Sequence, residues 1–299
     1  MTPAYNRGAP RLLAAVLLPA LVWALVGASD GRAMATEVAA APDSVRQGEC
    51  VFAYARPGGD TIAGECRWLE RVYSLFPAGD GYRAILPVPP AAPTGEQRLV
   101  IVLQDRAGNV TETTATVTIV ERDFGVQNLR MKKQTSRLYS DPKVAQEGKT
   151  IRAALTRSSH GQLWRGRFAR PCEGRVSTGF GVARSINGEI RYRHKGLDIA
   201  APAGTPVLAP NAGVATLVRH DYRLHGKTVV LDHGQGVGSL YLHLSEIGVE
   251  EGQRVAPGER IGKVGATGAA TGAHLHWAVY VDGEAIDPGF WTNLPAACR

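Results

Sequence analysis

The chain has 299 residues, a hydrophobic content of 44% and a formal net charge of +7 at pH 7. This length suits two domains better than one, and the apolar content is sufficient for a proper core, which excludes a chain too polar to fold. The 35 glycines and 18 prolines favour short strands and turns over long helices.

The N-terminus has the pattern of an export signal. Arg7 and Arg11 precede the apolar run "LLAAVLLPALVWALVGA", and small-x-small cleavage sites follow at 33–35 and, earlier, at 26–28. The alternative is an uncleaved membrane anchor, although the run is shorter than the roughly 20 residues that span a bilayer. No cysteine lies near the cleavage site, which argues against a lipoprotein. We expect residues 1–35 to be a signal peptide or anchor, and the protein to be exported to the periplasm or cell envelope.

Residues 36–122 have an all-β pattern. An Ala-rich stretch at 36–43 is typical of a tether. The clearest hairpin is "RLVIVLQDRAGNVTETTATVTIVE", in which a buried run at 99–103 meets the turn "DRAGN" before an alternating strand. Short strands between Gly/Pro turns predict a small β-sandwich, which resembles the immunoglobulin-like modules of exported bacterial proteins. The segment contains no histidine, and we identify no catalytic constellation in it.

Residues 123–170 form a basic connector with one predicted helix, around Pro142 to Arg157. Residues 121–170 hold 12 Lys/Arg against 4 Asp/Glu. Two interpretations stay open: the segment binds an anionic cell-surface polymer, or it is a solvated link between domains. A further hypothesis is that the connector lies over a groove of the C-terminal half and holds that half latent until it is displaced.

The pattern from residue 171 to residue 299 is β again, with more glycine. Seven of the eight histidines lie between 194 and 276, so this half is expected to carry the chemistry. In "GAHLHWAVYVDG" the alternation predicts a strand with His274 and His276 on the face opposite Leu275 and Trp277. In "SLYLHLS" the same reasoning places Tyr241 and His243 opposite the leucines at 240, 242 and 244.

"RHKGLDIAAPAGTPV" offers a histidine and a carboxylate four residues apart. On an extended strand His194 and Asp198 would stand roughly 13 Å apart, too far to bind one ion, and a bend at Gly196 would bring them together. Imidazole and carboxylate ligands suit Zn²⁺, and three protein ligands with an open fourth position are typical of a catalytic site. Each short motif alone is weak evidence, because an HxH pair is more often structural or accidental.

The three remaining histidines of this region favour a structural interpretation. His220 and His225 fall in a polar turn, and His233 ends a strand before a glycine. None of them has a motif that would assign it to a substrate.

Taken together, these stretches resemble a lysostaphin/LytM-type zinc metallopeptidase over about 171–291. The matching stretches, in the family's order and spacing, are "GRVSTGFG", "HKGLDIAAPAGTPVLAPNAGV", "VVLDHGQGVGSLYLHLS", "VAPGERIGKVGATGAATGAHLHWAV" and "DP". The resemblance implies a mainly β fold: an immunoglobulin-like β-sandwich followed by a C-terminal antiparallel-sheet domain of the duplicated hybrid motif type.

The resemblance also implies the roles of five residues. It makes His194, Asp198 and His276 the ligands of one Zn²⁺. It makes His243 and His274 the catalytic pair, of which one is the general base for the metal-activated water and both stabilise the tetrahedral intermediate.

Two departures from the family pattern concern the groove. Lys195 stands where many members have a small residue, and His225-Gly226-Lys227 stands where many have Tyr-Gly-Asn. Neither removes a ligand, so Lys195, His225 and the neighbouring Tyr241 are expected to shape the substrate groove. The groove walls are expected near 180–192, 220–227 and 265–271.

The function implied is that of an exported zinc metalloendopeptidase that hydrolyses peptide cross-links of bacterial peptidoglycan. The alternatives are a non-catalytic wall-binding regulator of other hydrolases and a zinc protease that acts on a protein outside the wall. Peptidoglycan is the expected partner. A monomer is expected, with no nucleic acid and no membrane contact beyond an uncleaved N-terminal segment.

The chain has four cysteines, at 50, 66, 172 and 298, and none has the spacing of a zinc ribbon. Export favours disulfides, and three pairings are conceivable. Cys50–Cys66 with Cys172–Cys298 is the pairing that keeps each bridge within one predicted domain.

Overall fold

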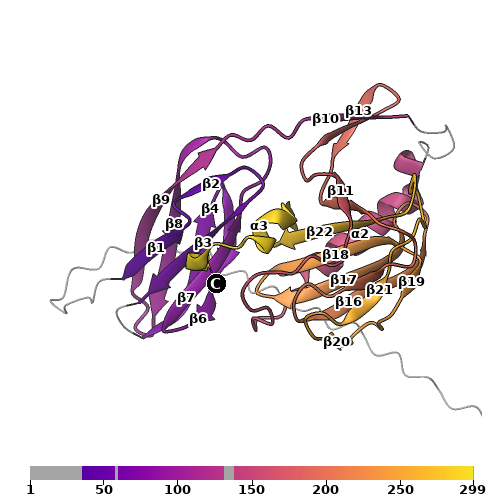
Figure 1. Ribbon diagram of the computed structural model, residues 1–299. Coiled ribbons are helices and arrows are strands. Elements are labelled where there is room, and N and C mark those ends of the chain that lie inside the picture. The colour runs from indigo at the N-terminus through magenta and orange to yellow at the C-terminus, as the bar shows by residue number, and fades with distance from the viewer. Residues whose placement is uncertain (1–35, 58–59, 131–137, 299) are drawn as a thin grey trace, which may run out of the picture. The chain divides into compact units, whose positions relative to one another are not determined.

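The computed structural model describes residues 36–57, 60–130 and 138–298 (Figure 1). The predicted signal segment at 1–35 lies outside these residues. The described chain is mainly β, as the sequence predicts. None of its helices is long and apolar enough to cross a membrane.

The N-terminal part consists of two β-sheets that enclose an apolar core. The four-stranded sheet has the order β1 (Glu37–Ala41), β3 (Cys50–Arg56), β7 (Gly81–Pro87), β6 (Phe76–Ala78). The five-stranded sheet has the order β2 (Ser44–Arg46), β9 (Val110–Val120), β8 (Gly95–Asp105), β4 (Thr61–Trp68), β5 (Arg71–Ser74). Alternate residues of each sheet meet in one core, including Val51 and Ala53 of β3 and Leu99 and Ile101 of β8.

Two expectations for this part can be compared with the structure directly. The predicted hairpin is confirmed, because β8 and β9 pair antiparallel without a register shift from Gly95↔Ile119 to Gln104↔Val110. The predicted Ala-rich tether is wrong: β1 lies within it and pairs antiparallel with β3. Alternate small side chains of this stretch pack against the core, which a reading from composition alone could not anticipate.

The C-terminal part is built on an eight-stranded sheet. Its order is β11 (Arg175–Thr178), β14 (Leu197–Ala200), β22 (His274–Val281), β18 (Val237–Leu244), β17 (Gly226–Gly234), β16 (Gly213–Tyr222), β20 (Arg254–Val255), with β23 (Glu284–Ile286) paired to β22. A second sheet has the order β15 (Pro206–Leu208), β21 (Arg260–Lys263), β19 (Glu246–Ile247). The short helical elements are η1 (Leu138–Ser140), α3 (Pro288–Thr292) and η2 (Ala296–Cys298).

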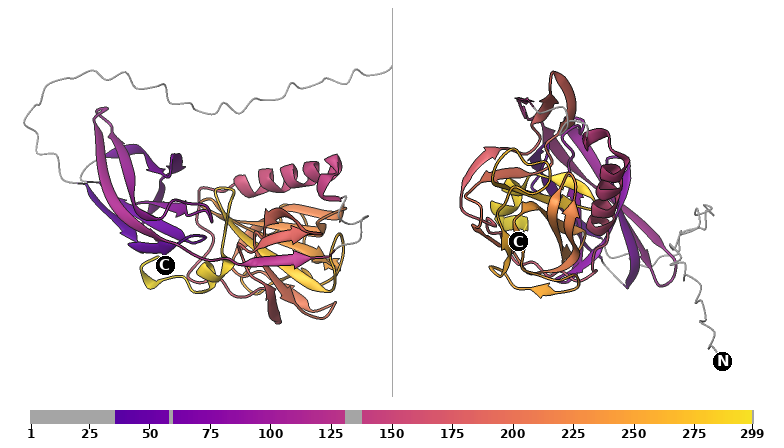
Figure 2. Two further views of the ribbon diagram at one scale, coloured as in Figure 1. Left: turned by 90° about the horizontal axis from the view of Figure 1, so that it is seen from above. Right: turned by 90° about the vertical axis from the view of Figure 1, so that its right-hand side faces the viewer.

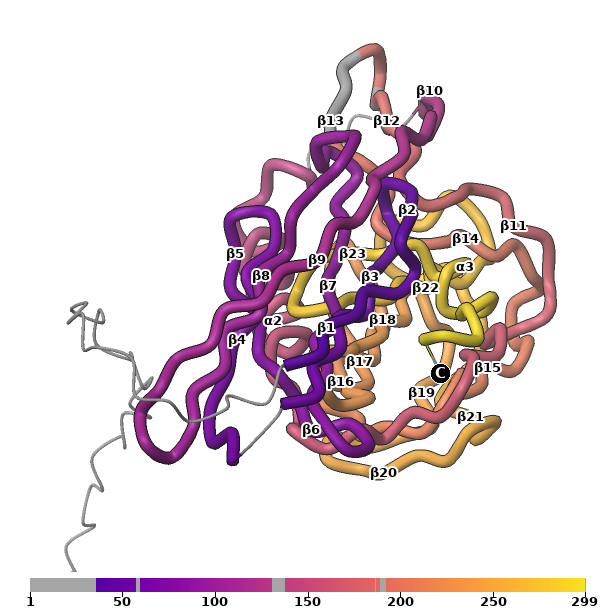
Figure 3. The backbone as a smooth tube through the Cα atoms, turned by 90° about the vertical axis from the view of Figure 1, so that its left-hand side faces the viewer, coloured from indigo at the N-terminus to yellow at the C-terminus, as the bar shows by residue number. Residues whose placement is uncertain are grey.

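A third small sheet lies beside the large one (Figure 3). Its strands are β10 (Val126–Leu129), β12 (Ala183–Ile186) and β13 (Glu189–Arg193). β10 pairs with β12 in parallel, and β12 pairs with β13 as an antiparallel hairpin. Part of the predicted connector is therefore hydrogen-bonded to the catalytic half.

The helix predicted in the connector is α2 (Pro142–Thr156). Asp141 caps it by accepting a hydrogen bond from the Lys143 amide, and Pro142 occupies the first turn, where its missing N–H costs nothing. α2 covers one face of the large sheet (Figure 2). Its buried stripe includes Ile151 and Leu155, which join the core beneath it. The helix thus belongs to the folded unit that carries the histidines.

The predicted disulfides are not formed, because all four cysteines are free and buried. Cys50 and Cys66 lie in different cores: Cys50 packs with Phe52 on one face of β3, whereas Cys66 lies between the two N-terminal sheets. Cys172 and Cys298 share a core, but the Cys298 thiol donates to the Ala41 carbonyl oxygen at 3.4 Å. The pairing argument used domain membership, which does not fix side-chain direction.

Candidate metal centre and active site

The register of two neighbouring strands brings the first two candidate ligands together. β14 and β22 are antiparallel, and Asp198 lies directly opposite His276 in this pair. On the other face of β22, Leu275 and Trp277 pack into the apolar cluster that also contains Ile199 and Trp291, as the alternation predicts. This cluster is the main core. The opposite face therefore presents His276 toward Asp198.

The third candidate ligand reaches the same point through a bend. His194 precedes β14, and the chain bends at Gly196 as expected. A Cβ atom at Gly196 would lie 2.3 Å from the Trp277 carbonyl oxygen, so the backbone can approach β22 this closely only with glycine at this position. The close approach places the His194 ring beside Asp198.

The three side chains meet through single atoms. Asp198 Oδ1 lies 2.9 Å from His194 Nε2 and 2.9 Å from His276 Nδ1, and the two nitrogens are 3.0 Å apart. All three residues are buried, and their donor atoms lie within 4.8 Å of one another. Two imidazole nitrogens and one carboxylate oxygen are a donor set that fits Zn²⁺ and leaves room for a fourth position.

Neighbouring groups orient these donors. His194 Nδ1–H donates to the Gly179 carbonyl oxygen at 2.8 Å, which leaves Nε2 with a lone pair toward the centre. Arg184 of β12 donates to Asp198 Oδ2, so the two oxygens of that carboxylate have different partners. Burial raises the pKa of Asp198, but the interactions of its carboxylate with the neighbouring His194 and His276 rings outweigh this effect, so the pKa lies well below its usual range.

A second pair of histidines lies beside this centre. The rings of His243 and His274 are 4.9 Å apart, and His274 Nε2 is 3.9 Å from Asp198 Oδ1. Each ring donates its Nδ1–H to a backbone carbonyl: His243 to Thr267 at 2.9 Å and His274 to Gly272 at 2.8 Å. Both Nε2 atoms therefore keep a lone pair that can accept a proton.

Burial and nearby charge keep His243 and His276 neutral at neutral pH. Burial lowers the pKa of His243 to about 3, with further contributions from His274 and His276. Burial also lowers the pKa of His276 to about 4, although its hydrogen bond to Asp198 opposes the shift. A neutral imidazole is the form that binds a metal or accepts a proton.

The alternation predicted for "SLYLHLS" holds from Leu240 to Leu242 and fails from His243 onward. Leu240 and Leu242 face α2, whereas Tyr241 and Leu244 face the main core. His243 reaches the site because its φ is +63°, a left-handed conformation that interrupts the strand alternation. His243 therefore faces the cavity that Leu240 and Leu242 also line, and not the opposite face that the alternation predicted.

A cavity of about 950 Å³ opens over this centre and is lined by the five residues His194, Asp198, His243, His274 and His276. Of the three expected groove residues, Lys195 and His225 line the cavity. Tyr241 does not: its side chain is fully buried, and its hydroxyl is 2.8 Å from Ser239 Oγ. Tyr241 alternates with Leu240 and Leu242 as predicted, but its face of the strand packs into the core, so its expected place in the groove is wrong.

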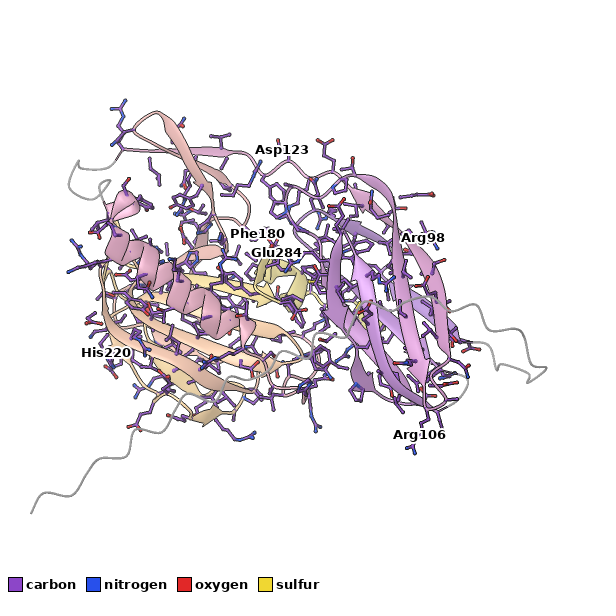
Figure 4. All side chains as sticks on the ribbon, turned by 180° about the vertical axis from the view of Figure 1, so that it is seen from behind. Arg98, Arg106, Asp123, Phe180, His220 and Glu284 are labelled. Carbon is purple, nitrogen blue, oxygen red and sulfur yellow. The ribbon has the colours of Figure 1, made fainter. Side chains whose placement is uncertain are left out.

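The other two histidines lie away from the cavity. His220 is exposed near the end of β16, at the periphery in Figure 4. His233 is fully buried and donates its Nδ1–H to the Ala212 carbonyl oxygen at 2.7 Å, while its Nε2 accepts from Ser239 at 2.7 Å. The structural interpretation of both is supported by these positions.

One wall of the cavity comes from the predicted connector, which the latency hypothesis placed over the groove without naming residues. Residues of α2 line it, among them Lys149 and Arg152, and Arg184 and Tyr139 contribute from neighbouring segments. The excess of positive charge in residues 121–170 was a hint, but it did not show which cations would face the site. Only the packing of α2 on the sheet reveals that.

Comparisons with known proteins agree with this geometry. The family model of peptidase family M23 matches residues 192–288 of this chain. A solved structure of an M23 peptidase from Pseudomonas aeruginosa is 30% identical, with a TM-score of 0.59, over 81% of this chain and 92% of that one.

Two curated relatives match part of the chain. Peptidoglycan DD-endopeptidase ShyA of Vibrio cholerae is 44% identical over 105 residues, which are 35% of this chain and 24% of the relative. DD-carboxypeptidase/endopeptidase Mpg of Neisseria meningitidis is 40% identical over 114 residues, which are 38% of this chain and 26% of the relative. The chain thus spans about a quarter of the length of these curated relatives.

Proposed function

The chain belongs to peptidase family M23, and from this premise we propose that it is a zinc metalloendopeptidase that hydrolyses peptide cross-links of bacterial peptidoglycan. The observation that carries the proposal is the meeting of His194, Asp198 and His276 within hydrogen-bond distance beside His243 and His274. The similarity to a peptidoglycan DD-endopeptidase supports the substrate class.

We assign the metal to the three residues whose donor atoms converge. His194 would bind through Nε2, His276 through Nδ1 and Asp198 through Oδ1, because these atoms already face one point. Bound zinc supplies the Lewis acidity that activates water and polarises the scissile carbonyl. Arg184 holds the other carboxylate oxygen of Asp198 and so fixes the orientation of that ligand.

The two remaining histidines handle protons and charge. The hydrogen bond of His243 to Thr267 fixes its tautomer, with Nε2 free to take a proton from the attacking water. His274 has the same arrangement through Gly272. Once protonated, either ring can stabilise the oxyanion of the tetrahedral intermediate or return the proton to the leaving amine.

The remaining parts of the proposal concern the whole protein. Residues 1–35 would direct export to the periplasm or cell envelope, and residues 36–122 would form an immunoglobulin-like sandwich, in keeping with their two packed sheets. Residues 123–170 would connect it to the catalytic domain at 171–299. A monomer with peptidoglycan as its partner fits this organisation.

The alternatives predict different results. A non-catalytic regulator would not need a complete metal donor set, and the set here is complete. A zinc protease with a protein substrate would keep the chemistry but not the wall specificity. The similarity to ShyA and Mpg favours the wall.

The test is mass spectrometry of fragments that residues 36–299 release from purified peptidoglycan, with and without a chelator. Chelator-sensitive loss of cross-linked peptides would support the endopeptidase and identify its bond. No release from zinc-loaded protein, together with cleavage of a protein substrate or activation of another hydrolase, would support one of the alternatives.

A further inference from the structure

The cavity over the metal centre is strongly cationic. Among the described residues that line it, five are Lys or Arg: Lys149, Arg152, Arg184, Arg193 and Lys195. The single acidic residue of the described lining is Asp198. Its Oδ1 atom contacts His194 and His276, and its Oδ2 atom accepts from Arg184. A bound divalent cation would add to this excess of positive charge.

Three of these cations have no anionic partner within the described ranges. No ion pair joins Lys149, Arg152 or Lys195 to a carboxylate in that part of the chain, whereas Arg223 near the same helix pairs with Asp141. Lys149, Arg152 and Lys195 are exposed and line the same cavity. Like charges held together without a counter-ion are typical of a site that binds an anion.

Glu284 of β23 does not supply a counter-ion to these cations. Glu284 is not part of the cavity lining, and its carboxylate is 3.6 Å from Arg71 Nη1. The cations on the cavity side are therefore left without an anion from the described chain.

The two cations of α2 stand on a rigid support. Ile151 and Leu155 of the helix are 5% and 3% exposed, so the helix is fixed to the sheet beneath it. Glu147 is buried and accepts from the Arg223 amide at 2.6 Å, the Leu224 amide at 3.2 Å and His225 Nδ1 at 2.9 Å. These contacts fix α2 to the loop that forms the neighbouring wall.

α2 lies outside the region that the family model matches. α2 ends at Thr156, well before the matched region begins at residue 192. The two cations of α2 are therefore not among the residues that the family model describes.

We propose that Lys149, Arg152 and Lys195 form a subsite that binds the free carboxylates of the peptidoglycan stem peptide and positions the cross-link over the metal centre. This inference rests on the proposed function. Stem peptides carry carboxylates beside the amide bonds of the cross-link, and Lys and Arg recognise them by charge-assisted hydrogen bonds. The cations lie along the cavity beside the donor set, so a bound stem peptide would extend toward His194 and Asp198.

The experiment measures binding apart from turnover. A fluorescent uncross-linked stem peptide, which lacks the proposed scissile bond, is titrated with zinc-loaded residues 36–299, and anisotropy gives the Kd. The test variant is Lys149→Gln/Arg152→Gln. The matched control is Lys143→Gln/Arg157→Gln, which removes the same charge from the two ends of the helix, outside the cavity lining.

Two further ligands test whether binding depends on the carboxylates of the stem peptide or on negative charge alone. One is the same stem peptide with its carboxylates amidated, and the other is an oligoglutamate of equal net charge. We expect the test variant to raise the Kd for the free-acid peptide about 3- to 30-fold, as two partly exposed ion pairs would. The control is expected to stay within about twofold, and amidation should weaken wild-type binding by a factor similar to that of the test variant.

Several outcomes would overturn the subsite. These are no binding of the free-acid peptide, equal binding of the amidated peptide, an equal loss in the control, or oligoglutamate binding as tightly as the stem peptide. If the protein still releases cross-linked peptides in a chelator-sensitive way, the endopeptidase stands and only the subsite fails. If charge-selective binding is found without any release, the subsite stands and the enzymatic proposal fails.

Discussion

His233 offers a quantitative test of its structural role. The side chain is fully buried, packs 4.8 Å from the Phe168 ring and is hydrogen-bonded through both nitrogens. Burial lowers its pKa from 6.5 to about 4, while the Ala212 carbonyl and Asp232 act in the opposite direction. The ring is therefore neutral in the folded protein at pH values where it is protonated in the unfolded chain.

The sign of the pH effect follows from this difference. Above about pH 6.5 neither state binds the proton, so the full stability is present, and it is lost as the pH falls from about 6.5 toward about 4. The maximum loss is about 3 kcal/mol, because each unit of pKa difference corresponds to about 1.4 kcal/mol. A change from about pH 7.5 to about pH 5.5 enters the range in which stability is lost by about one pH unit. The free energy of unfolding should therefore fall by about 1.4 kcal/mol.

The assay compares wild type with His233→Gln, which keeps one donor and one acceptor but cannot titrate in this range. Urea unfolding is followed by tryptophan fluorescence for both metal-free proteins at the two pH values. The free energy of unfolding of wild type should fall by about 1.4 kcal/mol more than that of the variant. Equal falls in the two proteins would refute the argument that His233 is held neutral by its surroundings.

Other substitutions separate metal binding, proton transfer and the support of α2. His194→Ala should abolish zinc binding, as measured by competition with a chromophoric chelator. His243→Ala should keep the zinc but lower turnover about 10²- to 10⁴-fold, the usual contribution of a general base, and loss of the metal would instead make His243 a ligand. Leu155→Ala should lower the free energy of unfolding by about 2–5 kcal/mol, because its side chain is 3% exposed beneath the helix; a loss within measurement error would show that α2 is not fixed to the sheet.

The sequence predicted the elements whose pattern is local. The alternation of β22 is regular along its length, so the faces of His276 and Trp277 could be derived from it. The bend at Gly196 followed from the distance that an extended strand would impose. For β18 the same method failed at His243, where a single residue with φ of +63° reverses the side-chain direction.

Properties that depend on tertiary packing were beyond this reasoning. The helix of the connector was predicted within one residue at its C-terminal end, but nothing in its own sequence showed that it would form a wall of the cavity. The same limit applies to the cysteines. Cys50 and Cys66 are close in sequence, yet Cys50 of β3 faces the core that contains Phe52, whereas Cys66 of β4 faces the core between the two N-terminal sheets.

The latency hypothesis requires residues 123–170 to block the site residues. Deleting residues 123–170 would be a poor test, because Trp164 and Phe168 belong to the main core and their loss would unfold the domain. In the described ranges, every hydrogen-bond and ion-pair partner of the five site residues lies between 177 and 276, outside the connector. The connector therefore forms a wall of the cavity without occupying the donor atoms.

Tyr139 provides a cleaner test of latency. Its ring stacks on Tyr192 at 5.6 Å, on the cavity side of the β12–β13 hairpin, and both residues line the cavity. If this contact held a lid closed, Tyr139→Ala would raise kcat/KM for peptidoglycan fragments several-fold. We expect kcat/KM to stay equal or to fall, because the cavity is open with the contact intact, and Leu129→Ala on the same wall serves as the control. Activation by Tyr139→Ala but not by the control would establish a latent enzyme.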